Sequence, residues 1–234
     1  MTALVVIPTT GTQFLTTAIN SVLGQTYPKT ECLIVIDGPE FLQKTLEITK
    51  HFPTVKIMLL PWNTGANGFY GHRIYAASSF ITNHDYWLAL DQDNYLKPTH
   101  VEDQIINCEN NQLDWSYSLR SIYDKNGNYL LDDNCESLGK WPIFINDQSH
   151  LVDTSSYCIK REVITKIGGA WYGGWGADRQ FYAAISHYFP KFSTTRKHSL
   201  CYRLDGNPNS VNADFFINGN AEMIKRYGSK FPWH

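Results

Sequence analysis

The chain has 234 residues, of which 43% are hydrophobic and 18% charged, and its formal net charge at pH 7 is −2. This composition is typical of a globular protein rather than a disordered one. The length allows one α/β domain, or one domain with a lobe that grows from its loops. The charge argues against a general binder of nucleic acid, because such proteins normally carry a surplus of basic residues.

The cysteines and the apolar runs indicate a soluble, cytoplasmic protein. The five cysteines are scattered and form no CxxC pair, which favours reduced thiols over a disulfide framework. The N-terminal apolar run, Ala3–Ile7, has no basic region before it, so we expect no signal peptide. No stretch approaches the roughly 18 apolar residues that a membrane span needs, so we expect no transmembrane segment.

The first half of the sequence alternates between two hydrophobic periodicities. Continuous apolar runs are typical of buried parallel strands, and apolar residues spaced by three and four indicate amphipathic helices. We expect strands at 3–7, 32–36, 55–60 and 86–90, and helices at 12–23, 39–51 and 71–81. This order predicts an α/β fold with a mostly parallel, Rossmann-like sheet and crossover helices on its faces.

The second half is less regular. We expect helices at 98–108, 161–167, 178–188 and 213–227, a strand at 114–123, a hairpin turn at 125–128 and a surface loop over 132–150.

Polar side chains follow the parallel strands of the first half at the point where each strand ends. Ligands of such sheets bind beyond the carboxyl ends of the strands, so these side chains are the first candidates for a binding site. They are Thr9, Thr10, Asp37, Asn63 and the segment Asp91–Asn94.

Two of these positions allow a structural and a functional interpretation. Asp91-Gln92-Asp93 follows the fourth strand directly. Its carboxylates could converge on Mg²⁺ or Mn²⁺, which prefer oxygen ligands and share their shell with phosphates. The alternative is an Asp-rich turn before the next helix. Asp37 could accept a hydrogen bond from a base or a ribose, or could belong to an Asp-Gly turn without further function.

A glycine-dense segment, 173–179, opens the helix expected at 178–188. Its Trp175 could pack against the C–H face of a sugar ring. Asp178 could cap the helix, and it could also take a proton from an acceptor hydroxyl across the pocket. His198 could reach back and complete a metal site.

These motifs, in this order, resemble those of the family 2 glycosyltransferases, which have the GT-A fold. VVIPTT and SVLGQTYPKTECLIVIDG are similar to the family's first strand, first helix and second strand. LPWNTGANGFYGHR resembles its Asn-x-Gly…Arg segment, DYWLALDQDN its fourth strand and DxD motif, and KREVITKIGGAWYGGWGADRQFYAAI its acceptor-side element. The resemblance covers roughly residues 3–205 and departs from the family pattern at Gly11, Ile36 and Ala177, and in the spacing from Asn63 to Arg73.

The resemblance implies a role for each matching residue. It divides the single GT-A domain into a nucleotide-binding half, 1–97, and an acceptor-binding half, 98–234, with a small acceptor-side lobe. The nucleotide sugar would be held by Pro8, Thr9, Thr10, Asp37, Asn63, Gly65, Arg73, Asp91 and Gln92. The cation would be held by Asp91 and Asp93, and Asp178 would be the catalytic base. Apart from the resemblance, His198 is a third candidate ligand of the cation. The candidate sugar platform, from glycine- or proline-flanked segments, consists of Trp175, Gly174, Trp171 and Trp141.

The resemblance therefore implies a glycosyltransferase that depends on Mn²⁺ or Mg²⁺. It would move a hexosyl or deoxyhexosyl group from a nucleoside diphosphate sugar to a hydroxyl of a saccharide or glycan acceptor, with inversion. Two alternatives remain at this stage. A nucleotidyltransferase that makes nucleotide sugars usually has a basic loop after its first strand, where this chain reads PTTGTQF. A non-catalytic carbohydrate-binding descendant would lose the carboxylates that are present here.

Overall fold

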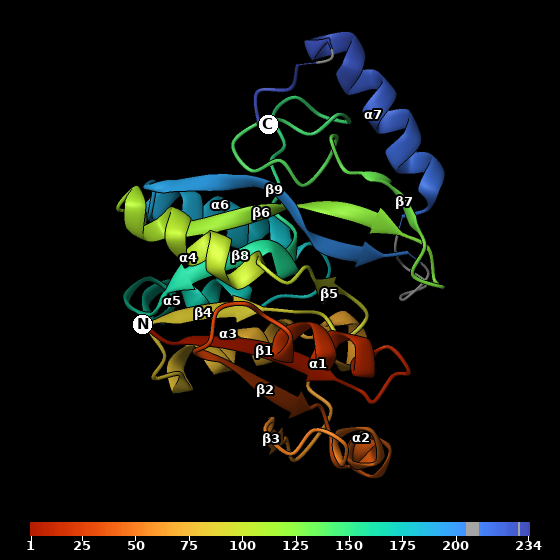
Figure 1. Ribbon diagram of the computed structural model, residues 1–234, viewed down its shortest axis with the longest axis vertical. Helices are drawn as coiled ribbons and strands as arrows, with labels where there is room; N and C mark the ends of the chain where they lie inside the picture. The colour runs from red at the N-terminus through yellow and green to blue at the C-terminus, as the bar shows by residue number, and fades with distance from the viewer. Residues whose placement is uncertain (205–210, 229) are drawn as a thin grey trace.

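The computed structural model describes residues 1–204, 211–228 and 230–234. Their strands join in one nine-stranded sheet with the order β3-β2-β1-β4-β8-β6-β9-β5, and β7 pairs with the outer part of β6. Figure 1 shows β1 to β3 at one end of the molecule and β7 and α7 at the other, with the middle of the sheet between them.

The first four strands form the parallel part of the sheet, as the hydrophobic periodicity predicts. These strands are β1 (Ala3–Thr9), β2 (Thr30–Ile36), β3 (Lys56–Leu59) and β4 (Tyr86–Ala89), and the helices that connect them are α1 (Leu15–Leu23), α2 (Leu42–Thr49) and α3 (His72–Ile81). The register pairs Thr9 with Ile36 and Val6 with Ala89. The carboxyl ends of β1, β2 and β4 therefore meet at one edge of the sheet, and the predicted α/β class is confirmed.

Beyond β4 the sheet is mixed. Its strands are β5 (Tyr95–Leu96), β6 (Trp115–Tyr123), β7 (Tyr129–Asp132), β8 (Tyr157–Lys160) and β9 (Phe192–Arg203). β8 runs antiparallel between β4 and β6, and β9 runs parallel to β6. The helices of this half are α4 (His100–Asn110), α5 (Arg161–Ile167), α6 (Ala177–Tyr188) and α7 (Ala213–Tyr227). β8 and β9 were not expected. In β8 only three apolar residues precede Lys160 before α5 begins, and β9 carries too many polar residues to show a strand pattern.

Each face of the parallel strands packs into its own hydrophobic core. Along β1, Leu4 and Val6 enter one cluster, whereas Ala3, Val5 and Ile7 enter the other. This alternation follows from the period of two in a strand, and burial on both faces explains why the run is continuously apolar.

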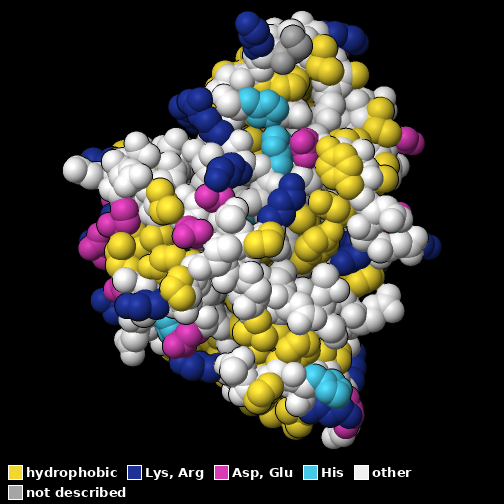
Figure 2. Space-filling model, in the orientation of Figure 1, with side chains coloured by type: hydrophobic (Ala, Val, Ile, Leu, Met, Phe, Trp, Pro, Cys, Tyr) yellow, Lys and Arg dark blue, Asp and Glu magenta, His cyan; other side chains and the backbone are white. Residues whose placement is uncertain are grey.

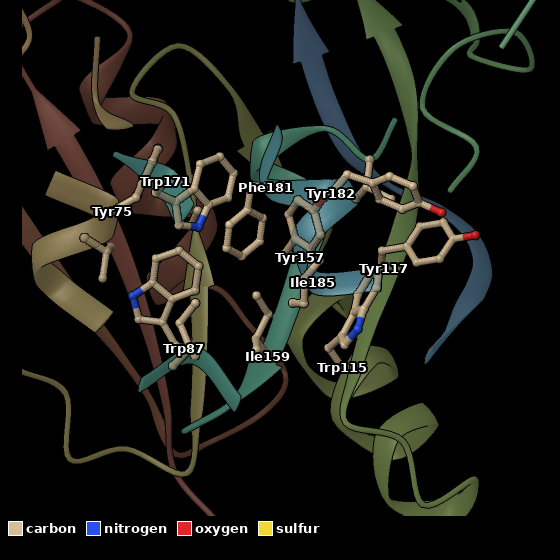
Figure 3. Packing of buried hydrophobic residues seen from close by; sticks show 14 of the residues in the cluster. Tyr75, Trp87, Trp115, Tyr117, Tyr157, Ile159, Trp171, Phe181, Tyr182 and Ile185 are labelled. Atoms are coloured by element: carbon tan, nitrogen blue, oxygen red, sulfur yellow. The ribbon is translucent and has the colours of Figure 1, made fainter. Parts of the chain in front are cut away.

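The larger core is rich in aromatic side chains, as Figure 3 shows. Trp171 stacks on Phe181 with ring centroids 4.0 Å apart, and Tyr157 meets both rings edge-on. α5 and the turn after it approach α3 closely, because a Cβ at Gly168 would lie only 1.9 Å from the Ser79 hydroxyl oxygen. The core thus fixes α5 and the turn that follows it as far as Trp171.

The loop predicted to lie on the surface at 132–150 is buried in its first part. Asp133 and residues 135 to 139 are buried, Asn134 is half-buried, and Asp133 has no exposed surface. The prediction was wrong because the acidic side chains of this segment do not face water; they surround Arg120, a buried arginine in the middle of β6.

The surface and the cysteines fit a globular chain. Figure 2 shows Lys and Arg side chains interspersed with Asp and Glu on the face in view, without a large field of one charge. All five cysteines are buried and free, as the scattered spacing predicts. In the described part of the chain, no helix is both long enough and apolar enough to cross a bilayer.

Candidate active site

A cavity of about 620 Å³ lies at the carboxyl ends of β1, β2 and β4, between the two halves of the sequence. It brings together eleven of the residues selected from the sequence, so the predicted gathering of distant side chains around one pocket is observed. These residues are Pro8, Thr9, Thr10, Asp37, Asn63, Gly65, Asp91, Gln92, Asp93, Trp175 and Asp178.

Gln92 joins the ends of β1 and β4. Its Oε1 accepts hydrogen bonds from the Thr9 hydroxyl at 2.7 Å and from the Thr10 backbone N–H at 3.1 Å, and its Nε2 donates to the Thr10 hydroxyl at 3.2 Å. The Thr9 hydroxyl in turn accepts from the backbone N–H of Gly11. The middle residue of the DxD triplet therefore fixes the shape of the first loop of the cavity.

Asp37 organises the loop that follows β3. Its Oδ1 accepts from the backbone N–H and the hydroxyl of Thr64, both at 2.7 Å, and its Oδ2 accepts from the Gly65 N–H at 2.8 Å. A Cβ at Gly65 would lie 2.3 Å from the Tyr70 carbonyl oxygen, so only glycine allows this close approach. Beside them, the carbonyl oxygen of the Asn63 side chain is buried and has no protein partner among the described residues.

Asp91 is held between the two halves of the chain. Its Oδ1 accepts from the Tyr75 hydroxyl at 2.8 Å, and the Ser155 hydroxyl lies 3.3 Å from its Oδ2 and accepts from its backbone N–H at 3.0 Å. Burial, and after it the negative charges of Asp93 and Asp153, raise the pKa of Asp91 to about 7. A nearby cation strongly stabilises the ionised form of a carboxylate with such a pKa.

Arg203 supports the outer part of the DxD segment. Its Nε donates to the backbone carbonyl of Asp93 at 3.0 Å, and its backbone N–H donates to the Asn94 Oδ1 at 3.0 Å. Burial raises the pKa of Asp93, whereas the charge of Arg203 opposes that shift. The arginine comes from the end of β9, so tertiary contact alone places it here.

The lining of the cavity has a surplus of negative charge, which a divalent cation would offset. Its carboxylates are Asp37, Asp91, Asp93, Glu136, Asp153 and Asp178, and its arginines are Arg120, Arg179 and Arg203. The described residues contain no group of three or more His, Cys, Asp or Glu arranged to hold a metal ion. Mg²⁺ and Mn²⁺ at phosphate sites need only one or two carboxylates, because substrate phosphates and water complete the shell. The residues present therefore fit such a cation.

Asp178 lies in the first turn of α6 and lines the same cavity as the DxD segment. The residue before the helix is Gly176 in the left-handed conformation, with φ 83°, and Asp178 does not cap the helix through its side chain. Its Oδ1 accepts from the backbone N–H of Arg179 at 2.8 Å. Trp175 lines the same cavity and is 81% exposed, so its ring is open to a ligand.

Five of the predicted site residues do not line the cavity. Trp171 is completely buried in the aromatic core, so its prediction as a sugar platform is wrong. The nearby Gly168 marks close packing against Ser79 instead of an open loop. Trp141 packs edge-on against Trp233, with ring centroids 5.8 Å apart. Gly174 abuts the Gly68 carbonyl from the neighbouring loop.

Arg73 is the fourth, and it acts as a clamp beside the cavity. Its guanidinium lies over the rings of Phe69, at 3.4 Å, and Tyr172, at 5.1 Å, and its Nη1 donates to the Thr64 carbonyl at 3.3 Å. It therefore joins the loop after β3 to the loop before α6.

His198 is the fifth residue outside the cavity lining. It is on β9, where its Nδ1 is 3.9 Å from Asp132 and its ring meets that of His234. Its Nε2 is buried and has no hydrogen-bond partner among the described residues. The structure does not bring His198 together with the predicted metal ligands of the DxD segment.

The sequence did not single out several polar residues of the lining. They are His72, Arg120, Glu136, Asp153, Arg179 and Arg203. One signal was available: Arg120 interrupts an otherwise uncharged strand, WSYSLRSIY, and a charged residue inside a buried strand requires partners. The partners themselves are separated along the chain and show no spacing that a pattern could detect.

Comparison with known proteins identifies the family. A sequence model described as glycosyl transferase family 2 matches residues 4–160. The chain belongs to this family. No curated protein sequence gives a significant match.

Solved structures of S. aureus TarS share the fold. Residues 1–349 of TarS superpose with a TM-score of 0.63 at 16% identity, over 87% of this chain and 60% of that one. The same fragment in complex with UDP-GlcNAc gives 0.66 at 15% identity, over 96% and 67%. A longer TarS structure gives 0.63 at 16% identity, over 99% and 44%. This chain thus spans about 60% of the TarS fragment and less than half of the longer TarS chain.

Proposed function

We propose that this chain is a metal-dependent glycosyltransferase that moves a sugar from a nucleoside diphosphate sugar to an acceptor hydroxyl, with inversion at the anomeric carbon. The observation that carries the proposal is one cavity that is lined both by Asp91 and Asp93, after β4, and by Asp178, from the start of α6. Membership of glycosyl transferase family 2 supports the reaction class.

The nucleotide is assigned to the loops after β1, β2 and β3. Gln92 and Asp37 fix the shape of these loops through their hydrogen bonds, and the unpaired carbonyl oxygen of Asn63 is available to a ligand N–H. TarS has been solved in complex with UDP and with UDP-GlcNAc, which makes a uridine diphosphate sugar the first donor to test.

The divalent cation, Mn²⁺ or Mg²⁺, is assigned to Asp91 and Asp93. The surplus of carboxylates in the lining and the raised pKa of Asp91 support this assignment. When bound, such a cation neutralises the negative charge that develops on the leaving diphosphate.

The acceptor is assigned to the wall formed by the start of α6. Trp175 offers its exposed ring to the C–H face of a saccharide. Asp178 accepts the proton of the attacking hydroxyl, which approaches the anomeric carbon from the side opposite the diphosphate. Direct displacement from that side gives inversion.

The experiment combines binding and turnover. Calorimetry with UDP, with MnCl₂ or with EDTA, tests the cation, and nucleotide release from a panel of nucleoside diphosphate sugars with saccharide acceptors tests the transfer. Asp178→Asn should bind UDP with unchanged affinity and lose about 10²-fold or more in kcat, the usual contribution of a general base.

Three results would count against the proposal. Near-full transfer by Asp178→Asn would remove Asp178 from its role, and undiminished UDP binding in EDTA would remove the cation. If wild-type protein released pyrophosphate from a nucleoside triphosphate and a sugar phosphate, it would be a nucleotidyltransferase instead.

A further inference from the structure

An ion-pair network, largely buried, forms part of the cavity lining. Arg120 on β6 is 3% exposed. Its Nε contacts Asp133 at 2.7 Å, its Nη2 contacts Glu136 at 2.5 Å, and its Nη1 contacts Asp153 at 2.5 Å. Three carboxylates around one guanidinium leave the cluster with a surplus of negative charge, and burying an uncompensated charge costs free energy.

Arg179 supplies the second positive charge. Its Nη2 contacts the other oxygen of Glu136, Oε1, at 3.2 Å, so Glu136 bridges the two arginines. The side chain of Arg179 is only partly exposed, and Arg179, Glu136 and Arg120 all line the cavity. The bridge therefore connects α6 to the central strand β6.

The bridge reaches the chain directly beside Asp178. The segment that leads into α6 contains Gly173, Gly174 and Gly176, the last with a positive φ, so its own backbone restrains the helix start weakly. The Arg179 side chain in contrast is fixed by Glu136, which the buried Arg120 fixes in turn. A side chain in the first turn of α6 is thus held from β6.

We propose that Glu136 and Arg179 are positioning residues that hold Asp178 in the orientation needed to accept the acceptor proton. This inference rests on the proposed role of Asp178 as the base. Neither residue needs to touch the substrate, because the bridge acts by fixing the start of α6. A displacement of a reacting group by about 1 Å can reduce a rate by about 10²-fold.

The test compares Arg179→Met and Arg179→Lys with wild type. Arg179→Met should lower kcat by about tenfold to hundredfold and leave the UDP affinity unchanged. The melting temperature should fall, because the buried Glu136 loses one of its two arginines, so kcat is measured well below that temperature. Arg179→Lys, which retains the charge, should recover part of the rate. Arg161→Met is the matched control, because Arg161 also lies in the first turn of a helix and donates to a backbone carbonyl, that of Asn83, but lies outside the cavity lining.

A double-mutant cycle separates the bridge from two independent effects. If Glu136 acts on Asp178 through Arg179, then Glu136→Gln should lower kcat in the wild-type background and cause little further loss in the Arg179→Met background. Fully additive losses would contradict the bridge. Should Glu136→Gln fail to fold, Arg179→Met alone still decides the matter.

The possible failures can be told apart. If wild-type protein transfers no sugar, or Asp178→Asn remains active, the proposed function is at fault. If wild type is active and Asp178→Asn is not, yet Arg179→Met keeps the kcat of wild type, only the positioning role is overturned.

Discussion

At the scale of single residues, two of the selected side chains form hydrogen bonds that fix the loops around the cavity. Asp37 accepts three hydrogen bonds from Thr64 and Gly65. The side-chain amide of Gln92 accepts hydrogen bonds from Thr9 and Thr10. Such groups hold the backbone in place, so the loops around the cavity need little rearrangement when a ligand binds.

Asp37→Ala tests this role. The substitution leaves the backbone N–H groups of Thr64 and Gly65 without their acceptor, which should cost about 1–3 kcal/mol of unfolding free energy. The loosened loop should also reduce UDP affinity by tenfold or more, measured by calorimetry alongside urea unfolding. Asp124→Ala is the control, because Asp124 accepts backbone N–H groups in an exposed hairpin far along the chain. Unchanged UDP affinity in Asp37→Ala would show that the loop does not depend on this carboxylate.

At the scale of elements, buried polar contacts fix how α4 and β9 pack. His100, at the start of α4, has no exposed surface. Its Nδ1 lies 2.9 Å from the Ser199 hydroxyl on β9, and its Nε2 accepts from Gln104 at 3.0 Å. Gln104 also donates to the Ser156 carbonyl and accepts from the Ser116 hydroxyl. These contacts join one helix to three segments of the mixed half of the sheet.

The titration of His100 predicts a pH dependence of stability. Burial lowers the pKa of His100 from 6.5 to about 4, so the folded state favours the neutral ring. The contribution of His100 to the unfolding free energy is therefore fully present above the pKa of the unfolded state, about 6.5. It is lost as the pH falls toward 4, and about 2 kcal/mol is lost at pH 5. The measurement is urea unfolding at pH 8 and at pH 5. The drop in unfolding free energy that His100 causes should be absent in His100→Asn. It should remain in the control His51→Asn, where the histidine is exposed. The same pH dependence in both variants would assign the loss to other groups.

At the scale of the whole molecule, the cavity is built by two parts of the chain that fold against each other. The parallel strands supply one wall, and the segments around β6, β8 and α6 supply the other. The end of the chain stabilises the second part: Trp233 is fully buried, stacks on Phe231 and donates to the Asn134 side chain at 2.8 Å. The last residues therefore hold the loop that carries Glu136.

Trp233→Ala should destabilise the protein by about 3–5 kcal/mol, because it removes a large buried ring and leaves a cavity. Urea unfolding provides the measurement. Trp62→Ala is the control, since Trp62 is 67% exposed, and it should change the unfolding free energy by no more than about 0.5 kcal/mol. A small effect of Trp233→Ala would mean that the terminal segment contributes little to this packing.

The sequence by itself determined the parallel half of the fold and the residues at its strand ends. Continuous apolar runs and helical spacings are local patterns, and in a parallel sheet the carboxyl ends of neighbouring strands must meet. Asp37, Asn63 and Asp91–Asn94 could therefore be assigned to one edge of the sheet from the residue pattern alone. The motifs at those ends carried the resemblance to the family in the same way, because each lies within one short segment.

Only the tertiary structure decided the other wall. β8 has only three apolar residues before Lys160 and runs directly into α5, and β9 is a strand because β6 and β5 hold it. The bridge from Arg120 through Glu136 to Arg179 joins residues from three segments. Trp171 was expected in an open loop, and only the packing shows that its ring is in the core. Burial and charge pairing depend on which segments meet in space. A local sequence pattern does not show which distant segments come into contact.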